Sequence, residues 1–81
     1  MPVQTLYIVQ QFEKQGRKLV KGRALDFRSA AEAVARAERD AVRFAGVVAV
    51  TVTVDTETGE TLEDPVILAQ HGEVPEGIIG G

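Results

Sequence analysis

Residues 29–54 read SAAEAVARAERDAVRFAGVVAVTVTV, and this stretch predicts a helix that is followed at once by a strand. Ser29 and Glu32 have the spacing of a capping box, in which the hydroxyl accepts from a backbone N–H and the glutamate reaches back to the first turn. Alanines and straight-chain residues continue to Ala45, and Gly46 can supply the left-handed residue that ends a helix. We therefore expect a helix from Ser29 to Ala45.

The strand after this helix shows an alternating pattern. Its valines alternate with alanine and threonine, which predicts one buried and one outward face. A helix face built of alanines lies close to its partner, so a sheet is the natural partner. We expect the valines to face the core and Ala49, Thr51 and Thr53 to face outward. The predicted core contains Leu6, Ile8, Val34, Ala37, Ala41, Phe44, Val48, Val50, Val52, Val66 and Leu68.

Each end of this central stretch continues into a predicted hairpin. Residues 55–60 (DTETGE) have turn composition, and Pro65 interrupts the return strand because proline cannot donate to a ladder. On the other side, residues 4–12 are apolar on both faces and predict a central strand, whereas Lys18 to Ala24 is polar and predicts an edge strand. The fold class is therefore α+β, in the order β-β-α-β-β, with a four-stranded, mostly antiparallel sheet and one helix packed on one face.

Size and composition limit the classes of protein to which the chain can belong. Its 81 residues predict a single domain over residues 1–71, followed by a glycine-rich and flexible tail over residues 72–81. The sequence contains no cysteine, which fits a reducing compartment and excludes disulfides and thiolate chemistry. No apolar run approaches the length of a membrane span. We expect a soluble cytoplasmic protein.

No residue pattern points to catalysis. His71 has no accompanying nucleophile motif, and we interpret it as a solvated residue at a strand end. The acids Asp55, Glu57 and Glu60 surround a turn without the spacing of a calcium loop. The glycines do not form a phosphate-binding loop. We expect a non-catalytic protein without a catalytic residue, a cofactor or a metal.

Charge is segregated along the chain. Residues 1–43 carry all nine Lys and Arg against five acids, whereas residues 44–81 carry seven acids and no base. Basic residues over 14–43 allow weak binding of nucleic acid. Because the net charge is −3 and aromatic residues are few, we favour a protein partner or a second copy as a homodimer. The candidate interaction surface consists of Arg36, Arg39, Arg43, Thr51 and Thr53.

The chain given ends in Gly80-Gly81. With the order β-β-α-β-β and a length near eighty residues, this ending resembles the ubiquitin-like sulfur carriers of the β-grasp fold. The resemblance implies that the carboxylate of Gly81 is adenylated by a partner enzyme and converted to a thiocarboxylate. It also implies that the first and last strands are central neighbours in the sheet. A sulfur carrier is therefore an alternative to the interaction protein.

Overall fold

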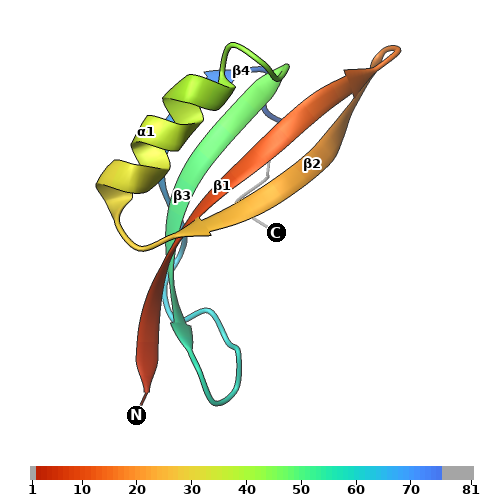
Figure 1. Ribbon diagram of the computed structural model, residues 1–81. Coiled ribbons are helices and arrows are strands. Elements are labelled where there is room, and N and C mark those ends of the chain that lie inside the picture. Colours follow the sequence, from red (N-terminus) through yellow and green to blue (C-terminus); the bar gives the residue numbers. More distant parts are fainter. Residues whose placement is uncertain (1, 76–81) are drawn as a thin grey trace.

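A computed structural model describes residues 2–75 and shows one sheet covered by one helix (Figure 1). The sheet has the strand order β2-β1-β3-β4, and all neighbouring strands are antiparallel. This arrangement confirms the predicted fold class. The elements are β1 (Val3–Gln15), β2 (Lys18–Phe27), α1 (Ala30–Asp40), β3 (Gly46–Asp55) and β4 (Val66–Gly72).

The start of the helix follows the capping prediction. The Ser29 hydroxyl accepts a hydrogen bond of 3.2 Å from the backbone N–H of Glu32. The Glu32 carboxylate in turn accepts one of 3.3 Å from the backbone N–H of Arg28. Both groups therefore satisfy donors that the first turn of a helix leaves without a partner.

The end of the helix differs from the prediction. Helix α1 ends at Asp40, whose carbonyl oxygen accepts from the backbone N–H groups of both Arg43 and Phe44. These bonds tighten the chain into turns and bring Phe44 against the core. Gly46 is not a left-handed helix stop, because it is the first residue of β3 and does not have a positive φ.

The face of β3 that the helix covers is also opposite to the prediction. The core cluster consists of Val9, Ala33, Ala37, Val47 and Ala49, so Ala49 faces the helix and Thr51 and Thr53 share its face. Both faces of β3 are apolar over residues 47–50, and alternation alone therefore does not decide which one the helix covers.

The predicted core residues consequently have different environments. Ala37 is buried under the helix, and Phe44 and Leu68 pack partly buried against the core cluster. Val48 is buried as well, but its alternation with Ala49 places it on the opposite face. Val66, at the edge, is 58% exposed. The remaining predicted core residues are only partly buried, namely Leu6, Ile8, Val34, Ala41, Val50 and Val52.

Two irregularities change the pairing of the edge strands. Between β1 and β2 the register shifts, and the Gln10 side chain donates to the carbonyl oxygens of Gly22 at 3.1 Å and Arg23 at 3.2 Å. Between β3 and β4 the register shifts after Ala49. The second bulge lets the consecutive residues Leu68 and Ala69 both pack against the core cluster.

The strand order separates this sheet from the β-grasp arrangement. The first strand pairs with β2 and β3, while β4 forms the edge of the sheet beside β3. A β-grasp crossover would make the first and last strands neighbours. In this sheet they are not neighbours. Residues 76–81 of the predicted tail lie outside the described residues. They include Gly80 and Gly81, on which the carrier alternative rests.

The chain crosses the sheet after β4. The backbone N–H of Glu73 donates to the carbonyl oxygen of Ala45 at 2.9 Å. A Cβ on Gly46 would overlap the carbonyl oxygen of Glu73, so this residue lies directly over the start of β3. Gly72 has a φ of 68°, a left-handed value that allows the turn. Glycine at these two positions thus permits the close crossing.

Candidate functional site

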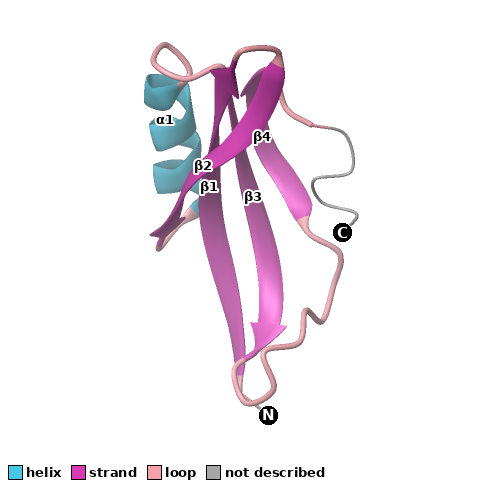
Figure 2. Cartoon of the chain, turned by 90° about the vertical axis from the view of Figure 1, so that its right-hand side faces the viewer, coloured by secondary structure: helices cyan, strands magenta, loops and turns pink. Residues whose placement is uncertain are grey.

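In residues 2–75, no helix covers the sheet face opposite to α1 (Figure 2). In the register, Leu6 pairs with Val52, Ile8 pairs with Val50, and Val50 pairs with Ile67. All five side chains are at least partly exposed, and Ile67 is 44% exposed. We call the surface formed by Leu6, Ile8, Val50, Val52 and Ile67 the open face. At its upper end, where the chain crosses Gly46, the apolar side chains are buried.

Opposite charges lie at the two ends of the sheet. One end is the β1–β2 hairpin, and the other is the loop between β3 and β4 (Figure 1). We call the first the basic tip and define it by Lys14, Arg17, Lys18 and Lys21. We call the second the acidic loop and define it by Glu57, Glu60, Glu63 and Asp64. Lys14 of the basic tip already pairs with Glu73 of the same chain, at 3.0 Å. The acidic loop lies at the other end of a molecule whose longest extent is 44 Å, too far away to neutralise the other charges of the tip within one copy.

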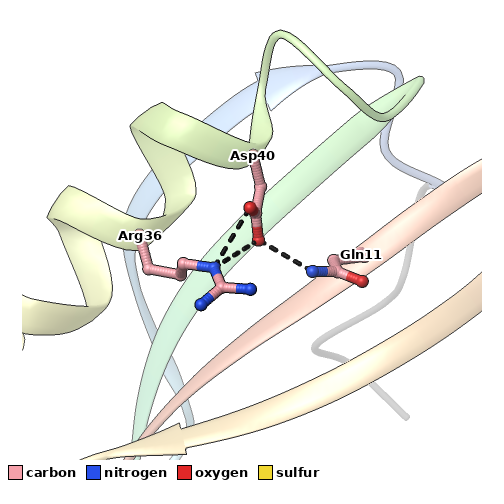
Figure 3. A network of polar contacts seen from close by, with 3 residues as sticks. All are labelled: Gln11, Arg36 and Asp40. Atoms are coloured by element: carbon pink, nitrogen blue, oxygen red, sulfur yellow. Dashed lines mark hydrogen bonds and ion pairs between the residues drawn. The ribbon is translucent and has the colours of Figure 1, made fainter.

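A polar network lies on the other side of the sheet, under the last turn of α1 (Figure 3). Asp40 is only 3% exposed, and its carboxylate accepts from the Gln11 amide at 2.7 Å. The Nε–H of Arg36 donates to both Asp40 oxygens, at 3.1 and 3.0 Å. Gln11 is itself only 4% exposed. The buried carboxylate is therefore hydrogen-bonded on two sides, as a charge removed from water must be.

A cleft of about 430 Å³ adjoins this network. Arg36 and Asp40 come from α1, Arg43 and Phe44 from the turn after it, and Arg23 from the bulge in β2. A second hollow of about 340 Å³ continues along the helix. It is lined by Arg36, Arg39, Asp40 and Arg43. The cleft thus gathers positive charge from three segments of the chain.

The structure brings together part of the predicted interaction surface. Arg36, Arg39 and Arg43 lie around one hollow, as their helical spacing suggests. Thr51 and Thr53 lie on the helix side of β3, where their Cα partners in β1 are Tyr7 and Thr5. They are therefore not part of the open face, and the prediction that they face away from the helix is wrong.

The sequence offered only weak signals for the other residues of the network. Gln11 interrupts an apolar strand, and Asp40 lies four residues after Arg36, a spacing that allows an ion pair on one helix face. No local pattern connects Gln11 with Asp40, because they are 29 positions apart. The bulge that carries Arg23 to the cleft also has no local sequence signal, since it arises from the pairing of two strands.

The single histidine is less solvated than expected. His71 pairs with Val47 in the sheet and is partly buried. Its Nε2 atom is buried and has no hydrogen-bond partner in the described part of the chain. Within residues 2–75, no three acidic or histidine side chains lie close enough together to hold a metal ion.

Comparison with family models, curated proteins and solved structures finds no significant match to this chain. No helix in the described residues is long and apolar enough to cross a membrane.

Proposed function

We propose that this chain is a non-catalytic interaction module that forms a homodimer through its open face. The observation that carries the proposal is the continuous group of five partly exposed apolar side chains on three adjacent strands. Exposed apolar groups that are continuous across a sheet mark interaction sites more often than scattered ones do. A second copy covers them by stacking its own sheet on the first.

Charge complementarity supports a second copy as the partner. A two-fold axis that lies between the stacked sheets and crosses the strands reverses the strand direction of the partner. It brings the basic tip of each copy to the acidic loop of the other, so the same attraction forms twice. The uncovered polar ends of one copy thus meet groups of opposite charge while the apolar centres meet each other.

A stable interface covers roughly 800 Å² on each partner. Four of the five side chains of the open face are only partly exposed. The stacked contact therefore has to extend beyond these five residues to the charged ends of the sheet.

The test is the molar mass in solution, measured by light scattering across micromolar concentrations. The wild-type chain is expected to be a dimer that dissociates on dilution. Ile67→Asp places a charge on the open face at an edge position, where it removes little packing within the monomer. We expect this variant to be monomeric. Thr53→Asp is the matched control, because it adds the same charge to the same sheet on the helix side and should remain dimeric.

Three outcomes would count against the homodimer. The first is a monomeric wild-type protein at every concentration. The second is a dimer that Thr53→Asp disrupts and Ile67→Asp does not. If removal of residues 76–81 converts a monomer into a dimer, the open face is covered by the end of its own chain, and the homodimer is not the native state. Circular dichroism of each variant confirms that a monomer is folded.

A further inference from the structure

We propose that the cleft between the end of α1 and the bulge of β2 binds the phosphate group of a small phosphorylated molecule. This cleft lies on the helix side of the sheet, so the proposal is independent of the open face. It depends on Arg36, Arg23 and Arg43, on the buried pair that positions Arg36, and on the dimensions of the cleft.

The guanidinium of Arg36 is held in place by a buried group. Its Nε–H is used by Asp40, and Asp40 is fixed by the amide of Gln11. The two terminal nitrogens lie on the far side of the guanidinium from Asp40 (Figure 3). Within residues 2–75 these terminal nitrogens donate no hydrogen bond to the protein. A positioned guanidinium with free N–H groups presents the fork geometry that binds phosphate oxygens.

Two further arginines surround the same space. Arg23 comes from β2, and Arg43 comes from the turn after α1. Gly22, beside Arg23, has so little room that a Cβ would lie 3.3 Å from the carbonyl oxygen of Gln11. The bulge therefore brings the β2 backbone close to the residue that orients Asp40. Three guanidinium groups from three segments can converge on one tetrahedral anion.

The charge of the cleft favours a small anion. Arg23, Arg36 and Arg43 contribute +3, and Glu13 and Asp40 contribute −2. Because the Asp40 carboxylate already accepts from the Nε–H of Arg36, a bound anion interacts mainly with the other N–H groups of the three arginines. Glu13, which also lines the cleft, repels a long polyanion such as nucleic acid, but can accept from a hydroxyl or amino group of a small ligand.

The size and lining of the cleft agree with this ligand class. Its volume of about 430 Å³ lies within the range of roughly 300–1,000 Å³ that small-molecule sites have. Phe44 adds an apolar wall on which the uncharged part of a ligand can rest. The site therefore suits a phosphomonoester with a small uncharged body better than it suits inorganic phosphate alone.

Titration followed by amide NMR spectra tests the proposal. The probes are inorganic phosphate, glucose 6-phosphate and a single-stranded oligonucleotide, each added at constant ionic strength. We expect both phosphates to shift the resonances of Arg23, Arg36 and Arg43 saturably. Glucose 6-phosphate should bind more tightly than inorganic phosphate, with a dissociation constant near or below about 1 mM.

Charge-matched variants make the test specific. Arg36→Gln should weaken binding of glucose 6-phosphate by about tenfold to a hundredfold, the effect of losing a hydrogen bond to a charged group. Arg28→Gln removes one charge outside the cleft and should leave binding unchanged. An unfolding curve for each variant establishes that it is folded.

Three results would overturn the proposal. One is the absence of saturable shifts in the folded wild-type protein. Another is an equal loss of binding in Arg36→Gln and Arg28→Gln, which would reflect net charge alone. The third is oligonucleotide binding that is tighter than phosphate binding and increases with oligonucleotide length, which would identify nucleic acid as the occupant instead.

Discussion

Removal of the Asp40 carboxylate is the most direct test of the buried network. In Asp40→Ala the Gln11 amide loses its acceptor, and the Nε–H of Arg36 loses both of its acceptors. Because Gln11 is almost completely buried, its donor has little access to water. The variant should therefore be less stable than the wild-type protein although no large side chain has been removed from the core.

The expected loss of stability follows from how exposed the two partners of Asp40, Gln11 and Arg36, are. An unsatisfied buried donor costs about 1–3 kcal/mol, and this term applies to Gln11. The Arg36 side chain is 37% exposed and can be hydrated again, so its loss adds only ~0–1 kcal/mol. The higher helix propensity of alanine offsets ~0.5 kcal/mol. The free energy of unfolding should fall by about 2 kcal/mol, from a total of roughly 4–12 kcal/mol for a chain of this size.

Urea unfolding monitored by circular dichroism measures this difference. Glu38→Ala is the matched control, because Glu38 is an exposed acid of the same helix, and it should change stability by less than about 0.5 kcal/mol. Adding Gln11→Leu to Asp40→Ala should recover part of the loss, since the orphaned donor is then absent. Equal effects of Asp40→Ala and Glu38→Ala, or no recovery in the double variant, would refute the reasoning.

Substitutions at three further positions test how the helix and the chain crossing are held, each by urea unfolding. Ser29→Ala removes the acceptor of the Glu32 N–H and should lower stability by about 1 kcal/mol, whereas Ser29→Gly should lower it by only a few tenths. Ala37 is completely buried, so the larger side chain of Ala37→Leu should lower stability by about 1–3 kcal/mol. An unchanged urea midpoint would contradict close packing of the helix on the sheet. Gly46→Ala forces the carbonyl of Glu73 away and should lower stability by a similar amount; tolerance of this change would show that the crossing is loose.

Much of the fold could be predicted from local patterns. The capping box identified the start of α1, and Pro65 identified the interruption before β4. The apolar stretch of β1 and the polar composition of β2 identified a central and an edge strand. Each of these signals depends on residues that are close together in the sequence, so each can be interpreted without knowledge of the rest of the chain.

The candidate sites were less predictable. Arg36, Arg39 and Arg43 could be grouped by their spacing, and the structure places them around one hollow. Arg23 and Gln11 could not be added to them, because a bulge and a contact across 29 positions bring them there. The alternation in β3 fits either orientation, and the sequence pattern therefore predicts a buried face where the structure has the open face.

The order of the elements, the segregation of charge and the apolar character of β3 follow from the amino-acid sequence alone. The orientation of β3, in which Ala49 faces the helix and Val50 and Val52 lie on the open face, depends on tertiary contacts. A strand with two apolar faces has the same period in either orientation. The pairing with β1 and the crossover through α1 select one of them, and these contacts join residues that are distant in the chain.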